Sequence, residues 1–342
     1  MLIPSVNKLF LYSYAKLNLY LEVLKQRKDH YHNIKTIFER IDLCDKIVLK
    51  ARRDKKINFT CNLPRVPTGQ SNLAYRSAKL LQETFNIDEG VDIKIIKRIP
   101  VAAGLGGGSS NAACVLIGLN GLWKLNLSKN KLVQLARKIG SDVPFFIYNC
   151  SFAKGEARGD RIRPLRVFNN LRLWHILVVP KVKVSTPFIY ERWDAECNYA
   201  SSYASASRRV TRDENFIRDK DSKTFKLTPL DKHGILNENS YLTGLRRPKR
   251  NVKILILALR KNNFSVLGDA LFNSLEWVTT SLYPQIRRIK EKLIRMGVKS
   301  ILMSGSGPAI FGIVSSRKEA LSLCRQLKRG NSFGEVFVTR TQ

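Results

Sequence analysis

The segment that decides the fold is Pro100–Ala113, PVAAGLGGGSSNAA, which separates an apolar run at 91–99 from a second one at 111–122. Its glycines let the backbone approach a ligand closely and adopt positive φ angles. Ser109 and Ser110 follow near the start of a predicted helix, where free N–H groups and the helix dipole favour an anion. We therefore interpret the segment as a phosphate-binding loop between a strand and a helix, and not as a flexible linker.

The loop matches neither of two common nucleotide-binding patterns. A Walker A loop would end in Lys followed by Ser or Thr, and no such pair follows these glycines. A dinucleotide fingerprint needs a third glycine where Gly104-x-Gly106-x-x-Ser109 has a serine. The segment therefore predicts phosphate binding of another type.

Outward from the loop, the apolar pattern predicts an α+β protein. Before the loop, we expect a helix at 71–85 with Ser71 as its N-cap, and strands at 15–24, 42–51, 56–61 and 91–99. After it, helices at 111–122 and 129–139 precede strands at 152–154 and 173–180. A tail with helices at 284–296 and 318–329 and strands at 299–303, 309–314 and 334–339 predicts a second α+β domain.

The segment from about 194 to 251 differs in composition from the rest. It is poor in Leu, Ile and Val and rich in Ser, Arg, Lys and Asp. A connection of this length is uncommon inside a compact domain. Its apolar area is too small to offset the entropy of ordering it, so we predict a basic surface insertion.

The charge of the chain is strongly positive. Its 342 residues include 60 Lys and Arg against 27 Asp and Glu, a formal net charge of +33. A polyanion partner would explain this balance, but so would a general drift towards Lys and Arg on solvated faces. The basic residues are spread along the chain without a nucleic-acid-binding motif, so we favour the second explanation.

Composition also argues against other classes. No apolar run approaches the ~20 residues that a membrane span needs, and the first residues lack the apolar core of a secretory signal. The six cysteines are scattered without a C-x-x-C pair, and no H-E-x-x-H motif occurs. The cysteine and histidine spacing therefore predicts neither a disulfide framework nor a zinc site.

Three motifs resemble the GHMP family of small-molecule kinases. Tyr14–Leu21 (YAKLNLYL) is similar to the family's first motif, Pro100–Ala113 to its second, and Met303–Gly312 (MSGSGPAIFG) to its third. Further segments resemble the branch of the family whose substrate carries a cytidine diphosphate: Tyr31-His32, Ser71–Leu73, Gly140–Phe146, Phe152–Asp160, Thr186-Pro187 with Tyr190, and Phe272–Glu276.

The resemblance implies a two-domain α+β fold. An ATP-binding domain at 1–180 would resemble domain 2 of ribosomal protein S5. A ferredoxin-like domain at 181–342, carrying the insertion, would close the cleft. ATP with Mg²⁺ is the implied cofactor.

The resemblance also implies roles for single residues. Asp142 matches the catalytic base and Lys16 the lysine paired with it, while Ser109 or Ser110 can contact Mg²⁺. The ATP-binding residues would be Pro100, Val101, Ala102, Ala103, Gly104, Leu105, Gly106, Gly107, Gly108, Ser109 and Ser110.

The substrate-binding residues follow from the same motifs. They would be Asn18, Tyr31, His32, Thr186 and Tyr190, with Asn72 assisting near the nucleotide or substrate. Tyr31 and Tyr190 would sandwich a cytosine ring while His32 reads its edge. Relatives usually have Gly where this chain has His30, before Tyr31.

The implied activity is ATP-dependent phosphorylation of the 2-hydroxyl of a methylerythritol that carries a cytidine diphosphate, in the non-mevalonate route to isoprenoid precursors. Another GHMP kinase, such as a homoserine kinase, and a degenerate kinase fold that binds nucleic acid are the alternatives. We expect a monomer or weak homodimer with no specific nucleic-acid or membrane partner. Its compartment would be a bacterial cytoplasm or, as the alternative, a plastid stroma.

Overall fold

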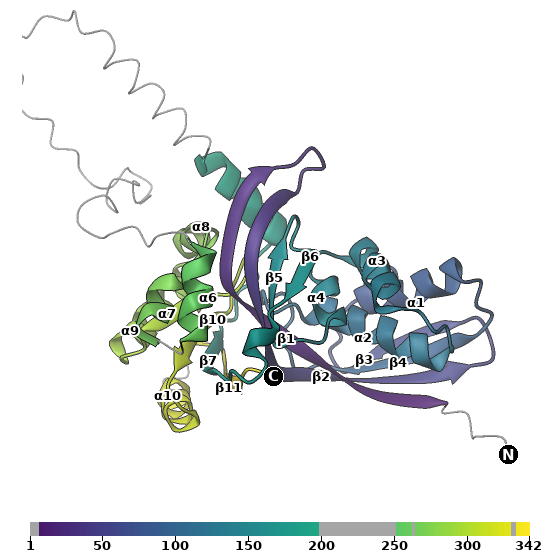
Figure 1. Cartoon of the computed structure of the whole chain (residues 1–342). Coiled ribbons are helices and arrows are strands. Elements are labelled where there is room, and N and C mark those ends of the chain that lie inside the picture. The colour runs from purple at the N-terminus through teal and green to yellow at the C-terminus, as the bar shows by residue number, and fades with distance from the viewer. Residues whose placement is uncertain (1–6, 198–250, 262–263, 330–332) are drawn as a thin grey trace, which may run out of the picture.

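The structure is a computed structural model that describes residues 7–197, 251–261, 264–329 and 333–342. Two β-sheets form its frame (Figure 1). The described helices are too short or too polar to cross a bilayer.

The first sheet is built around two long antiparallel strands. Its order is β3-β4-β2-β1-β8, with β5 and β6 attached to β2. The strands are β1 (Lys8–Gln26), β2 (His32–Arg52), β3 (Ile57–Cys61), β4 (Gly90–Ile96), β5 (Phe152–Glu156), β6 (Arg161–Pro164) and β8 (Phe272–Asn273). β2 pairs with β4 through Lys46–Arg52 and with β5 through Thr36–Glu39, so one strand holds both parts of the sheet together.

Helices cover one face of this sheet (Figure 1). They are α1 (Leu73–Thr84), α2 (Gly107–Leu122), α3 (Lys129–Ile139) and α4 (Val143–Ile147). The burial of β1 and β2 alternates towards their ends, where one face is open, whereas Ala15–Leu21 and Thr36–Glu39 are buried on both faces. α2 packs against strands and against three other helices, which explains why its sequence is apolar around most of its surface.

The second sheet has the ferredoxin-like strand order. β7 (Trp174–Val179), β9 (Ser300–Met303), β10 (Ile310–Val314) and β11 (Glu335–Arg340) are antiparallel and lie in the order β11-β7-β10-β9. Numbered along the chain this order is 4-1-3-2, that of a split βαβ motif. The α+β class is therefore confirmed.

The position of β7 corrects the predicted domain boundary. We predicted a division at residue 180, but β7 is a central strand of the second sheet, which places the change of sheet before Trp174. His175–Val179 are all buried, because strands lie on both sides of β7 and side chains cover both of its faces. A continuous apolar strand does not reveal from sequence which sheet it joins.

The remaining helices follow β6 in the chain, and α7, α9 and α10 among them pack against the second sheet. They are η1 (Arg166–Phe168), a helix over residues 186–197, α6 (Val252–Arg260), α7 (Phe264–Ala270), α8 (Glu276–Leu282), α9 (Pro284–Arg295) and α10 (Arg317–Arg329). One buried cluster joins the two sheets, with Leu17 of β1, Leu177 of β7 and Phe311 of β10 among its members. The cleft between the sheets is therefore built on a shared core.

Three local predictions need correction. Asn72, not Ser71, caps α1, because its Oδ1 accepts the N–H groups of Ala74 and Tyr75. α2 begins at Gly107 and not at 111, so the last glycines of the loop are already helical. Residues 194–197 are helical and Asn251 caps α6, so both ends of the predicted insertion belong to helices. Residues 198–250 lie outside the described residues.

Candidate active site

The predicted phosphate loop leads from β4 into α2. Gly106 is the N-cap of α2, has a φ of 67°, and provides no side-chain cap. The N–H of Ser110 donates to the Gly106 carbonyl at 2.9 Å. The N–H groups of residues 107–109 precede the first N–H that donates within the helix, that of Ser110, so they stay available to an anion. This geometry suits an anion such as a phosphate.

The loop packs against the third glycine-rich motif. Gly104 has a φ of 75°, and a Cβ there would overlap the carbonyl oxygen of Ser304. The Ser304 hydroxyl donates to the Gly104 carbonyl at 3.0 Å, and the N–H of Ala309 donates to the Ala103 carbonyl at 3.3 Å. Motifs from opposite ends of the chain thus form one wall of the site.

Asn273 holds the third motif in place. Its side-chain amide donates to the carbonyls of Met303 and Gly305 at 2.8 and 2.7 Å, and its Oδ1 accepts the N–H of Leu275 at 2.9 Å. Glu276 accepts the N–H of Met303 at 3.0 Å. The segment Phe272–Glu276 therefore supports the glycine-rich turn and does not line the cavity.

Lys16 and Asp142 come together across the fold. Lys16 Nζ lies 3.5 Å from Asp142 Oδ2, and their side chains are 5% and 28% exposed. Lys16 also donates to Asn18 Oδ1, as the shared strand face predicts. Asp142 stands at the N-cap of α4, yet its side chain caps nothing there. The described contact of its carboxylate is therefore the one with Lys16, and not a cap of α4.

Gly106 brings Lys16 to the phosphate cradle. A Cβ at position 106 would lie 2.9 Å from Lys16 Cγ and 3.2 Å from Phe146 Cζ. The backbone N–H of Lys16 donates to the Leu105 carbonyl at 3.0 Å. The lysine side chain can lie against the start of α2 only because this residue has no side chain.

A buried polar network supports the loop, and sequence analysis did not identify it. The fully buried Asp45 accepts the N–H groups of Arg98 and Ile99 at 2.8 and 2.9 Å, and pairs with Lys97. Asn111 donates to Asp45 at 2.9 Å. The signal was present in the sequence, because Asp45 occupies an inward position of an alternating apolar strand.

The two serines of the loop differ in their surroundings. Ser110 is 3% exposed, and its hydroxyl accepts a hydrogen bond from Ser13 at 2.8 Å. Ser109 is half-buried in the first turn of α2. Of the two, Ser109 is the more accessible to solvent.

Histidine and aromatic rings form the other end of the site. His32 stacks on Tyr190 with ring centroids 5.2 Å apart and meets the edge of Trp193 at 5.6 Å. His32 Nε2 lies 2.8 Å from Asp194 Oδ1. Burial raises the pKa of Tyr190, and the carboxylates of Asp142 and Asp194 act in the same direction. Tyr190 is therefore a neutral phenol at physiological pH.

Tyr31 is the exposed aromatic of this end. It is 55% exposed, and the Arg158 guanidinium lies 5.3 Å from its ring centroid. Its N–H donates to Asp29 Oδ1 at 3.3 Å, and the hydrogen bond from Arg27 lowers the pKa of Asp29. His30 has a φ of 61°, a conformation that favours glycine.

One cavity of about 520 Å³ collects most of the predicted catalytic and substrate residues. Its lining includes Lys16, Asn18, Tyr31, His32, Gly104, Gly106, Asp142, Thr186 and Tyr190. Thr186 also contacts the third motif, since its hydroxyl lies 2.7 Å from that of Ser306. Residues that the sequence analysis did not select, among them Arg158 and Ser141, line it as well.

Other residues of the predicted ATP set lie outside this cavity. Ala103 and Leu105 are buried in the shared core, and their carbonyls accept backbone hydrogen bonds. Asn72 is occupied as a helix cap. Ala103 and Leu105 shape the site through the backbone, whereas Asn72, which was predicted to assist near the nucleotide or substrate, caps α1 with its side chain.

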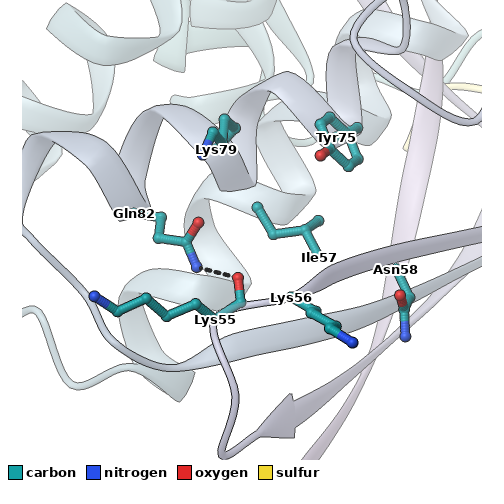
Figure 2. A pocket seen from close by; sticks show the side chains of 7 residues that line it. All are labelled: Lys55, Lys56, Ile57, Asn58, Tyr75, Lys79 and Gln82. Atoms are coloured by element: carbon teal, nitrogen blue, oxygen red, sulfur yellow. Dashed lines mark hydrogen bonds between the residues drawn. The ribbon is translucent and has the colours of Figure 1, made fainter.

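A second hollow, of about 290 Å³, lies between α1 and β3 (Figure 2). Its lysines Lys55 and Lys79 are paired with Asp88 and Glu83, and the Gln82 amide donates to the Lys55 carbonyl at 2.9 Å. The hollow contains none of the predicted site residues, and we do not assign it a catalytic role.

No group of three or more His, Cys, Asp or Glu side chains among the described residues can hold a metal ion. Asp142, which lines the cavity, carries carboxylate oxygens of the type that Mg²⁺ prefers.

The chain matches the models of the GHMP kinases N terminal domain at residues 72–150 and of the GHMP kinases C terminal at residues 255–332. It is 35% identical over 336 residues to the 4-diphosphocytidyl-2-C-methyl-D-erythritol kinase of Acetivibrio thermocellus, covering 98% of this chain and 100% of that relative. The chain belongs to the GHMP kinase family.

Solved GHMP kinase structures agree with this assignment. The crystal structure of a 4-(cytidine 5'-diphospho)-2C-methyl-D-erythritol kinase superposes with a TM-score of 0.68 and 29% identity, covering 98% of this chain and 100% of that chain. The homoserine kinase of Cytophaga hutchinsonii superposes with a TM-score of 0.66 at 18% identity, covering 100% and 98%. At that identity the second likeness concerns the fold alone. The predicted family and fold are confirmed.

Proposed function

We propose that this GHMP kinase transfers the γ-phosphoryl group of ATP to the 2-hydroxyl of 4-diphosphocytidyl-2-C-methyl-D-erythritol, in the non-mevalonate route to isoprenoid precursors. The curated relatives that it matches along nearly its whole length carry the name of this kinase. The observation that supports the proposal best is one cavity that holds both the Lys16–Asp142 pair and the rings of His32 and Tyr190.

Asp142 is the proposed general base. An alcohol is a poor nucleophile, and a carboxylate that accepts its proton during transfer makes the attack easier. The ammonium of Lys16, 3.5 Å from the carboxylate and nearly shielded from water, holds the Asp142 side chain in place. The same ammonium can face the oxygens of the transferred group.

The glycine-rich loop is the proposed ATP phosphate site. The N–H groups at the start of α2 can bind an anion without a cationic side chain. Because Gly106 has no side chain, Lys16 lies close to these N–H groups. Mg²⁺, when bound to ATP, would neutralise charge on the phosphates. Ser109 is its proposed protein contact, since Ser110 is buried against Ser13.

The cytidine end of the substrate is proposed to lie between Tyr31 and Tyr190, with His32 at the edge of the base. Aromatic rings bind the flat face of a nucleobase by stacking. Asn18, which accepts a hydrogen bond from Lys16, and Thr186, which lines the same cavity, are the proposed contacts of the polyol or its diphosphate.

We further propose that the enzyme acts in a bacterial cytoplasm, with a plastid stroma as the alternative, and as a monomer or weak homodimer. The relatives reported above support the bacterial setting. A homoserine kinase would have no use for the rings around His32, and the described residues offer no motif for specific nucleic-acid binding.

A substrate panel tests the proposal. Purified full-length protein with ATP and Mg²⁺ is assayed for ADP release with the cytidyl substrate, homoserine, mevalonate and galactose. We expect turnover with the cytidyl substrate alone. Turnover with homoserine, or with none of the four, would contradict the proposal.

A further inference from the structure

The carboxylate of Asp194, the first residue of the predicted insertion, lies against His32, which is proposed to contact the edge of the cytosine base. Asp194 Oδ1 is 2.8 Å from His32 Nε2, and the two side chains are 29% and 4% exposed. An ionised carboxylate only accepts hydrogen bonds, so the hydrogen of this contact belongs to Nε2. We propose that Asp194 is a positioning residue that holds His32 as the Nε2–H tautomer and so makes the site selective for cytosine over uracil.

One helix fixes the imidazole from several sides. Tyr190 stacks on the ring with an interplanar angle of 29°, Trp193 meets its edge at 86°, and Asp194 binds Nε2. These residues share a face of the helix at 186–197, because positions three and four apart are neighbours. Both the plane of the ring and its tautomer are thereby set before a substrate arrives.

The tautomer decides which base the ring can read. When Nε2 carries the hydrogen, Nδ1 of a neutral imidazole is an acceptor. The described contacts give Nδ1 no partner, and His32 lines the cavity. Cytosine presents an amino donor at position 4, where uracil presents a carbonyl acceptor. Nδ1 therefore forms a hydrogen bond with cytosine and opposes uracil.

This inference rests on the proposed function, and its test separates the two. Binding of cytidine 5'-diphosphate and uridine 5'-diphosphate to the full chain is measured by titration calorimetry, which needs no turnover. Asp194→Ala should weaken cytidine diphosphate binding and lower the cytidine-to-uridine preference by about tenfold. Asp194→Asn retains an oxygen that accepts from Nε2–H, and it should recover most of the preference.

Steady-state kinetics and a matched control complete the design. In turnover, Asp194→Ala should raise KM for the cytidyl substrate by about tenfold while kcat changes by less than about twofold. Glu196→Ala is the control, because Glu196 lies on the same helix and pairs with Arg192 at 3.6 Å, away from His32. It should leave both the preference and KM unchanged.

The tautomer itself is observable. The chain has four histidines, so selective ¹⁵N labelling of histidine gives a spectrum in which His32 is assigned by its loss in His32→Asn. We expect the Nε2–H pattern in the wild type and averaging of the two nitrogens in Asp194→Ala.

The outcomes that overturn the proposal are distinct. An Nδ1–H pattern in the wild type, or an Asp194→Ala variant that loses affinity equally for both diphosphates, would show that Asp194 only docks the helix. Cytidine preference without turnover of the cytidyl substrate would leave this inference standing and contradict the proposed function.

Discussion

His30 has a left-handed backbone conformation that favours glycine, with a φ of 61°. For a residue with a Cβ this conformation costs roughly 1–2 kcal/mol. Replacement by glycine removes this cost, but the greater entropy of the unfolded chain with glycine offsets about 0.4–1 kcal/mol of the stabilisation. His30→Gly should therefore raise the free energy of unfolding by about 0.5–1 kcal/mol, measured by urea denaturation.

The control for position 30 runs in the opposite direction. Val is β-branched and tolerates positive φ poorly, so His30→Val should lower the free energy of unfolding. A Gly variant less stable than the wild type would show that the His30 side chain makes a contact worth more than the strain.

Asp142 is the residue on which the proposed chemistry depends. Asp142→Asn keeps the shape of the side chain and removes its ability to take a proton. We expect kcat to fall by at least about 10²-fold, with ATP and substrate binding nearly intact by calorimetry. Asp88→Asn, an exposed carboxylate paired with Lys55, is the control that should keep full activity. Full activity in Asp142→Asn would contradict the assignment of the base.

At the scale of elements, the start of α2 lies between the proposed phosphate site and Lys16, which pairs with Asp142. A Cβ at Gly106 would press on Lys16 and Phe146, and its φ of 67° strains any residue other than glycine. Gly106→Ala should displace the lysine from Asp142 and lower kcat by about 10- to 100-fold, measured with saturating substrates.

Gly121 offers the matched comparison on the same helix. A Cβ at Gly121 has open space around it, and Ala is the better helix former. Gly121→Ala should therefore keep its kcat. Equal kcat values in the two alanine variants would show that Gly106 has no role in placing Lys16.

At the scale of the whole molecule, the prediction concerns the basic segment of residues 198–250, which follows the helix at 186–197 and precedes α6. A variant in which a Gly/Ser linker replaces residues 198–250 keeps the helix at 186–197 and Asn251, whose side chain accepts the N–H of Lys253 at 2.9 Å. We expect kcat to be retained, because the segment offers little apolar area for packing. A modest, salt-dependent fall in kcat/KM should follow from the loss of positive charge.

A longer replacement, of residues 194–250, tests the boundary. It also removes Asp194, so it should raise KM for the cytidyl substrate beyond the value of the shorter variant. Loss of kcat in the shorter variant would show that the segment belongs to the catalytic body.

The sequence by itself determined what depends on neighbours along the chain. The strand, the loop and the apolar helix around Pro100–Ala113, and the limits of α3 at 129–139, follow from glycine freedom and from hydrophobic periodicity. The motif resemblance also selected Lys16, Asp142, His32 and Tyr190, all of which line one cavity.

Only the tertiary structure decided which distant residues meet. Periodicity tells which face of an element is buried, but not which element covers it, so β7 was assigned to the wrong sheet. From sequence alone, a single carboxylate is expected to be solvated, because its hydrogen-bond partners are not known. Asp45 under the loop and Asp194 beside His32 acquired their roles because packing of the two sheets and one helix placed donors within hydrogen-bond reach of them.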